Sequence, residues 1–142
     1  LSPHNRGLTR RAIVSFDTAT SDQLMYRLKR AGHVASKMRF HSAQLLSYLS
    51  DGLWLRLAGR ANEAMAELAT GLRKHDVQLL AEPQANLLFA RVGQPAIERL
   101  AAANILFYPM GDGVLRFATS FQTTEDDVAE VLRRAEVALS PG

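Results

Sequence analysis

The densest group of side chains that could bind an anion lies between Arg27 and Phe40. This stretch holds six basic residues, counting His33, and it could form a nucleic-acid surface, an anion site or a solvated helix face. A solvated face is the usual outcome for such a cluster. Arg39 follows Met38, a member of an apolar helical stripe, so its guanidinium should emerge beside the packed face. There it could hold a phosphate or a carboxylate through two parallel hydrogen bonds.

A second candidate for anion binding is Arg116, inside the strand-like run Val114–Ala118. Side chains alternate along a strand, so Arg116 shares one face with the ends of this run, while Leu115 and Phe117 point the other way. This alternation predicts that the arginine stands on a partly covered surface. An arginine in that position either pairs with a structural carboxylate or binds an anionic ligand, and the residues alone leave both open.

Other reaction centres are scarce in this sequence. The four histidines are spread apart, and neither an HExxH spacing nor a cysteine is present, so we expect no metal site. His41 falls on the apolar stripe of its helix, which favours a core or partly buried histidine over a ligand or a base. The GxSxG, GxxxxGK[ST] and GxGxxG motifs are absent, which excludes the enzyme classes that depend on them.

Length and composition describe a folded, soluble chain. Its 142 residues fit one domain of ordinary size, with 47% hydrophobic and 22% charged residues. The net charge of +3 is too small to imply a nucleic-acid or membrane partner by itself. No apolar run approaches the roughly 20 residues that span a bilayer, and residues 1–11 lack the apolar core of a signal peptide. We therefore expect a cytoplasmic protein without nucleic-acid or membrane partners.

Hydrophobic periodicity and turn signals predict the elements that must position these arginines. Five strands are expected: a first one at 12–16, and four more at 77–80, 86–92, 105–108 and 114–118. Five helices are expected. The first begins with a cap at residues 20–22 and ends at Gly32, and the next two cover 34–50 and 53–74. The last two begin at about Gln94 and at Thr124. This order predicts an α+β or mixed α/β fold, a small sheet covered by helices. The strand at 12–16 is separated from the others by a long helical stretch, which favours a place in a different sheet.

Several segments resemble one known family when they are taken together. They are Lys29-Arg30-Ala31-Gly32-His33, Ser36-Lys37-Met38-Arg39-Phe40, Ala43-Gln44-Leu45-Leu46, Leu53-Trp54-Leu55, Asn86 to Val92, and Val114 to Phe121 followed by Thr124 to Val128. In order and spacing, this set resembles the low-specificity L-threonine aldolases of the aromatic amino acid beta-eliminating lyase and threonine aldolase family. The resemblance covers nearly all of the chain from Ala12 onward.

The resemblance implies the C-terminal domain of a pyridoxal-phosphate (PLP) enzyme with the aspartate-aminotransferase-like fold, fold type I. Such an enzyme is a carbon-carbon lyase that cleaves beta-hydroxy-amino acids such as threonine to glycine and an aldehyde. Residues at the position of Arg116 hold the substrate carboxylate in that family. Basic residues at positions like Lys29 and Arg39 lie near the cofactor phosphate or the subunit interface. The family is tetrameric or dimeric, so the resemblance also implies a homo-oligomer.

One departure from the family concerns the lysine that forms the Schiff base with the cofactor. Family members carry it in a Thr-Lys-Asn-Gly stretch just before the strand that corresponds to residues 12–16. Counting back from Ala12 reaches Pro3-His4-Asn5-Arg6, which places His4 at the expected lysine position, and the first lysine of the chain is Lys29. An imidazole cannot form the internal aldimine, so the chain is expected to be inactive alone and to bind no cofactor by itself.

Two interpretations of the whole chain follow: a C-terminal fragment of a longer enzyme, or a degenerate family member that keeps the small domain without the chemistry. In either, residues 1–17 correspond to a remnant of the large PLP-binding domain, 18–50 to linking helices and 51–142 to the C-terminal small domain, a mostly antiparallel sheet packed with helices. The alternative function is a non-catalytic oligomerisation or anion-binding interaction module.

Overall fold

The computed structural model describes residues 13–34, 36–75 and 77–140 of the chain. The chain divides into two compact units that meet between Trp54 and Leu55. We describe each unit by itself. In the described ranges, no helix is both long enough and apolar enough to cross a membrane.

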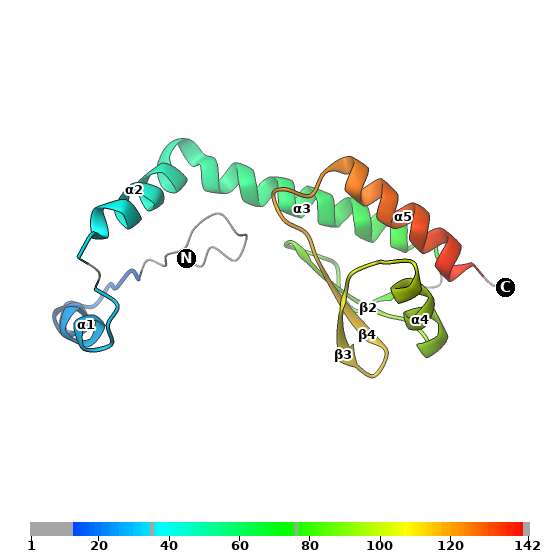
Figure 1. Cartoon of the computed structure of the whole chain (residues 1–142), viewed down its shortest axis with the longest axis horizontal. Helices are drawn as coiled ribbons and strands as arrows, with labels where there is room; N and C mark the ends of the chain where they lie inside the picture. The colour runs from blue at the N-terminus through cyan, green and yellow to red at the C-terminus, as the bar shows by residue number, and fades with distance from the viewer. Residues whose placement is uncertain (1–12, 35, 76, 141–142) are drawn as a thin grey trace. The chain divides into compact units, whose positions relative to one another are not determined.

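Two helices and a single 3₁₀ turn make up the described part of the N-terminal unit (Figure 1). The helices are α1, Thr18–Arg30, and α2, Met38–Leu49, and the turn is η1, Ser50–Gly52. The Asp17 carboxylate caps α1 by accepting a 2.7 Å hydrogen bond from the Thr20 amide. The cap therefore lies three residues before the earliest one that the sequence predicted. Gly32, with a φ of 71°, follows α1 in the left-handed conformation that glycine adopts without strain, so the predicted end of this helix is confirmed.

The strand predicted at 12–16 is wrong where the structure describes it. Residues 13–17 form neither strand nor helix, and Phe16 is fully exposed. A strand needs a neighbour to satisfy its backbone groups, and no described segment pairs with this one. The N-terminal unit also lacks a core, because none of its described residues is buried.

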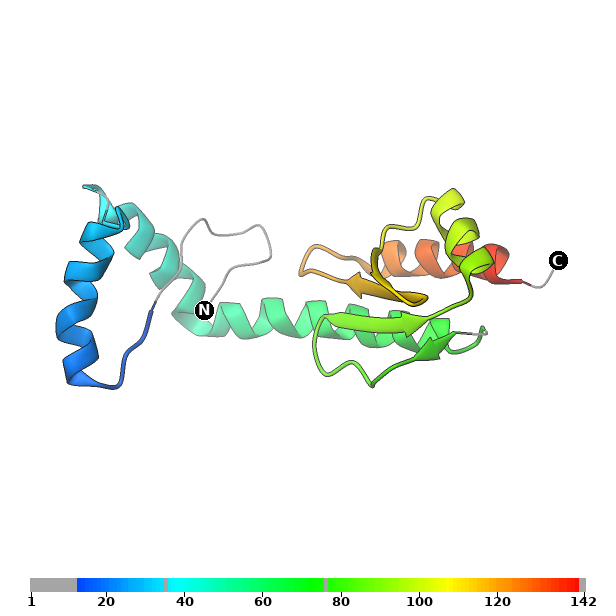
Figure 2. The same ribbon diagram turned by 90° about the horizontal axis from the view of Figure 1, so that it is seen from below.

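The C-terminal unit is built on a four-stranded antiparallel sheet of order β1-β2-β4-β3. The strands are β1, Gln78–Leu79; β2, Leu87–Arg91; β3, Tyr108–Gly111; and β4, Val114–Ala118. The helices are α3, Leu53–Leu72; α4, Gln94–Ala102; and α5, Glu125–Leu139. Helices α3 and α5 run along one face of the sheet, and Figure 2 looks onto its strands with these helices behind. The predicted α+β fold class, a small mostly antiparallel sheet with helices, is confirmed.

Strict alternation in β2 and β4 separates the core from the outer face of the sheet. The inward residues pair across the strands as Leu88 with Phe117 and Ala90 with Leu115, and all four are buried. Of the α3 stripe that the spacing predicts, Leu57 is half-buried, and the buried members are Ala61, Ala64, Leu68 and Leu72. The helix also buries three residues that the predicted stripe did not include, Met65, Ala69 and Gly71.

The third strand is displaced from its predicted position at 105–108. Ile105 is buried in the core before the strand begins, and only Tyr108 of the predicted run belongs to β3. The following turn explains the shift, because Asp112 and Gly113 both have positive φ angles, as two-residue hairpin turns require. The predicted loop 109–113 thus supplies most of the strand as well as the turn.

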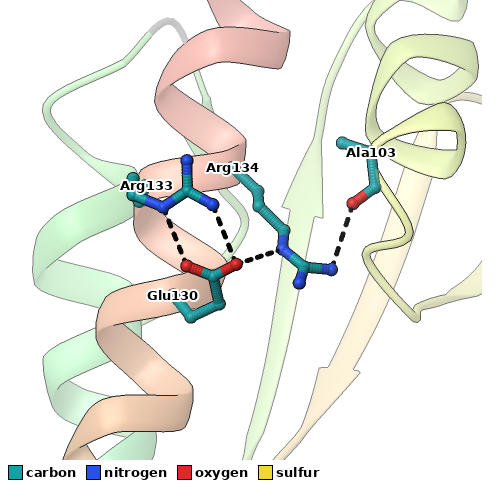
Figure 3. Close-up of polar contacts among 4 residues, drawn as sticks. All are labelled: Ala103, Glu130, Arg133 and Arg134. Carbon is teal, nitrogen blue, oxygen red and sulfur yellow. Dashed lines mark hydrogen bonds and ion pairs between the residues drawn. The ribbon is translucent and has the colours of Figure 1, made fainter.

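Helix α5 begins with a capping box at Thr124, where the sequence predicts the start of this helix. The Thr124 hydroxyl accepts from the Asp127 amide at 3.1 Å, and the Asp127 carboxylate accepts from the Thr124 amide at 2.9 Å. One turn later, Glu130 forms ion pairs with Arg133 and Arg134. Figure 3 shows this group, in which Arg134 also donates to the carbonyl oxygen of Ala103 at the end of α4. These contacts help to hold α5 beside α4.

A glycine allows α3 and α5 to approach closely. Gly71 is buried, and a Cβ built on it would lie 2.8 Å from Cγ of Leu132 and closer still to the methyl carbons of that side chain. Gly59 lies on the same helix, but a Cβ there would meet no atom within 4 Å. The two glycines therefore form a matched pair for testing this contact.

We predict that Gly71→Ala lowers the free energy of unfolding by about 1–3 kcal/mol, because Leu132 must move out of its packed position. Gly59→Ala should instead raise the free energy of unfolding by about 0.5–1 kcal/mol, since alanine favours the helix and the site has room. Urea unfolding followed by circular dichroism measures both. Equal effects of the two substitutions would contradict a close α3–α5 contact.

We predict that Glu130 makes stability depend on acid pH. Hydrogen bonds from Arg133 and Arg134 lower the pKa of Glu130 from 4.5 to about 2. A lowered carboxyl pKa stabilises the fold above the ordinary pKa, and this contribution is lost as the pH falls from about 4.5 towards 2. Unfolding curves of the wild type and Glu130→Gln should therefore converge as the pH falls through this range. Added salt should reduce the difference because the group is at the surface, and parallel pH profiles would contradict the assignment.

Candidate anion-binding site

Arg116 lies at the centre of β4, on the face of the sheet opposite the core. Its partners in register are Phe89 on β2 and Tyr108 on β3, so one row of the sheet reads Phe89, Arg116, Tyr108. Leu115 and Phe117, its neighbours along the strand, are both buried in the core. The predicted alternation of β4 is therefore confirmed, and it presents Arg116 on the outer face.

The guanidinium of Arg116 lies over an aromatic ring rather than beside a carboxylate. Its central carbon is 4.5 Å from the centroid of the Tyr108 ring, a cation–π contact. Its Nε is buried and has no hydrogen-bond partner in the described part of the chain. The ion pairs found among the described residues involve other arginines. Of the two roles that the sequence left open, pairing with a structural carboxylate is not found among the described residues.

The side chains around Arg116 on the outer face are mostly apolar, which favours the binding of an anion by its guanidinium. Leu87, Phe89 and Tyr108 are 41%, 36% and 64% exposed on the outer side of the sheet. No aspartate or glutamate occupies any of the four strands. Arg91 of β2 lies on the same face, in register with Val114, so an anion that reached the Arg116 guanidinium would meet positive charge and apolar side chains but no strand carboxylate. Charge-assisted hydrogen bonds are stronger in such surroundings than in open water.

The other two predicted site residues lie in the N-terminal unit. Lys29 is exposed in the last turn of α1, and Arg39 is exposed in the first turn of α2. The Arg39 guanidinium lies 5.2 Å from the ring centroid of its neighbour Phe40. The role of Lys29 and Arg39 at a phosphate or a subunit interface remains a prediction.

The predictions for the histidines have different outcomes. His4 lies outside the described residues. His41 is half-buried on α2, as its place on the apolar stripe predicted. No group of three or more metal-ligating side chains forms among the described residues.

Sequence reasoning missed Tyr108 and Phe89 as neighbours of Arg116. They lie 8 and 27 positions away along the chain, and only the strand register brings them together. The displaced start of β3 concealed Tyr108 in particular. The Asp112-Gly113 pair indicates a two-residue turn, but a regular hairpin on that turn would place Pro109 opposite Arg116. The register shift between Pro109 and Gly111 brings Tyr108 into that position, and no local sequence signal predicted it.

Comparison with solved structures identifies the class of fold. The threonine aldolase of Leishmania major superposes with a TM-score of 0.73 at 22% identity, over 82% of this chain and 35% of that chain. The alpha-aminoadipate aminotransferase of Thermus thermophilus, complexed with N-(5'-phosphopyridoxyl)-L-leucine, gives a TM-score of 0.57 at 17% identity, over 84% of this chain and 35% of that one. The chain has the fold of the C-terminal region of fold type I PLP enzymes.

Sequence comparison then points to one group within this class. The low-specificity L-threonine aldolase of a Pseudomonas species (strain NCIMB 10558) is 37% identical over 132 residues, which is 91% of this chain and 38% of the aldolase. No family model matches the chain. The chain is thus partially homologous to the low-specificity L-threonine aldolases, and it spans little more than a third of their length.

The described residues do not by themselves fit the PLP cofactor of this class. Lys29 and Arg39 are both exposed, and the Arg39 guanidinium lies over Phe40. Neither side chain is enclosed in a way that would hold a phosphate away from water. Arg116 does fit a carboxylate, because its buried Nε needs an acceptor.

Proposed function

We propose that this chain forms the C-terminal part of a PLP-dependent threonine aldolase or beta-eliminating lyase. Such an enzyme cleaves beta-hydroxy-alpha-amino acids, threonine among them, to glycine and an aldehyde. The observation that carries the proposal is the unpaired Arg116 in a chain 37% identical to a low-specificity L-threonine aldolase over 132 residues. In this proposal the chain is inactive alone.

Arg116 contributes substrate orientation to the reaction. Two parallel hydrogen bonds from its guanidinium to the substrate carboxylate fix that group, and with it the direction of the carbon-carbon bond that breaks. The cofactor, when bound by the complete enzyme, supplies the electron sink for the carbanion. No described residue of this chain takes a part in that second function, which is why we propose that the chain lacks activity alone.

The remaining groups of the site are proposed to come from the part of the relatives that this chain does not span. The exposed, unpaired segment 13–16 supports this, because its apolar residues Ile13, Val14 and Phe16 are between 61% and 100% exposed. In the proposal, this segment joins the sheet of a large domain, where its backbone would find partners.

A chimaera tests the role of Arg116. The matching C-terminal region of the Pseudomonas aldolase is replaced with residues 13–142 of this chain, so that the aldolase keeps its own Schiff-base lysine, and aldehyde release from L-threonine is measured. Arg116→Gln should lower kcat/KM by about 10- to 150-fold, the loss expected for hydrogen bonds to a charged group. Arg116→Lys should restore only part of the rate, because an ammonium cannot form the bidentate pair.

Two controls accompany the chimaera. Arg60→Gln removes another exposed arginine, on α3 rather than on the outer face of the sheet, and should leave kcat/KM within a few-fold of the starting value. The 142-residue chain alone, supplied with PLP and L-threonine, should form no glycine or acetaldehyde at an enzyme-like rate. An active chimaera that tolerates Arg116→Gln would remove the proposed role of this residue, and an active lone chain would remove the proposed inactivity.

We also propose that the protein is a homo-oligomer. Neither α1 nor α2 buries a residue, and Met25 and Leu46 are 64% and 70% exposed on them. Apolar helices without cover tend to associate. Light scattering of the purified chain should therefore show species larger than the 15.6 kDa monomer, and the double substitution Met25→Ser, Leu46→Ser should shift them towards the monomer. A wild-type chain that stays monomeric at high concentration would contradict this proposal.

A further inference from the structure

We propose that Tyr108 is a positioning residue for Arg116: its ring holds the guanidinium in place while leaving the guanidinium N–H groups available to an anion. The inference rests on the proposed function only for the identity of that anion, a substrate carboxylate. The geometric part concerns two side chains of this unit and stands without it.

The contact between the two residues is fixed by the sheet itself. Tyr108 and Arg116 are partners in register on the adjacent antiparallel strands β3 and β4. Directly opposite side chains on one face lie close enough to contact. The guanidinium carbon sits 4.5 Å from the Tyr108 ring centroid, within the range of a favourable cation–π contact.

An aromatic ring positions a cation differently from a carboxylate. A carboxylate accepts the N–H groups of an arginine and neutralises its charge, as Glu82 does for Arg73 in this unit. The Tyr108 ring attracts the charge through its electron-rich face and uses none of the in-plane N–H donors. Arg116 is therefore oriented and still able to bind an anion.

The unpartnered Nε supports a role beyond packing. It is the buried side-chain atom without a hydrogen-bond partner among the described residues. A purely structural arginine would be expected to satisfy that group or to expose it. A carboxylate that accepted from this Nε, after a covering side chain moved aside, would provide the missing partner while the ring remained in contact with the guanidinium face.

The N-terminal unit offers a comparison in the same chain. Arg39 lies over the ring of Phe40, but at 5.2 Å, between consecutive residues, and both side chains are exposed. That pair is not set by strand pairing. A substitution in it serves as the control for general effects of losing an aromatic neighbour.

The test uses the 142-residue chain and nuclear magnetic resonance of the arginine Nε–H groups, with the Arg116 signal assigned from its loss in Arg116→Lys. In the wild type, we expect slow exchange of the Arg116 Nε proton with water and a saturable shift of its signal on titration with sodium acetate. Tyr108→Phe keeps a ring and should retain both properties. Tyr108→Leu should speed exchange and weaken acetate binding by about 3- to 30-fold.

Tyr108 is 64% exposed, so its substitution opens no cavity in the core. The backbone amide spectrum checks the fold of each variant, and Tyr108→Met replaces Tyr108→Leu if the latter does not fold. Phe40→Leu should leave the Arg116 signal unchanged. Acetate binding and proton exchange that are the same in Tyr108→Leu as in the wild type would overturn the inference, and so would a wild-type signal that acetate does not shift.

The outcome is distinguishable from failure of the proposed function. An inactive chimaera together with ring-dependent acetate binding would reject the aldolase role and keep Tyr108 as the positioning residue of an anion site. An active chimaera together with ring-independent binding would keep the aldolase role and reject the inference.

Discussion

The alternation of β4 is the constraint on which the rest of the site depends. Leu115 and Phe117 are 0% and 6% exposed in the core, and Arg116 between them must therefore face outward. A slip of one residue in the pairing with β2 would bury the guanidinium and expose both apolar side chains. The hydrophobic core thus sets the register, and the register sets the position of the charge and of the aromatic ring beside it.

Local patterns were sufficient to predict the parts of the fold in which one face is strongly apolar. Helix α3 and strand β4 lie where their spacing placed them, since each buries a continuous stripe or alternate residues in the core. The same reasoning put Arg116 on the outer face. Its aromatic neighbours could not be predicted in this way, because the row from Phe89 to Tyr108 joins three strands whose order and register are tertiary facts.

The two strand predictions that were wrong concern apolar runs, which can either pair as strands or take another place in the structure. Residues 105–108 have strand-forming side chains, yet Ile105 fills the core before β3 begins. Residues 13–16 have the same character, but a short apolar run becomes a strand only when another strand accepts its backbone hydrogen bonds. No described segment does so here. Propensity identified both runs as apolar and could not tell which partner each would meet.

The arginines of the C-terminal unit differ in how their charge is balanced. Arg73 and Arg133 lie at the surface, and each pairs with a carboxylate there, Glu82 and Glu130 respectively. Arg116 is less exposed than either, so its charge loses more contact with water, yet no carboxylate of the described chain offsets that loss. A residue selected for stability alone would show the opposite trend, since pairing matters most where water is scarce. Proteins accept such a cost at functional sites, and bound carboxylate is the partner that would remove it.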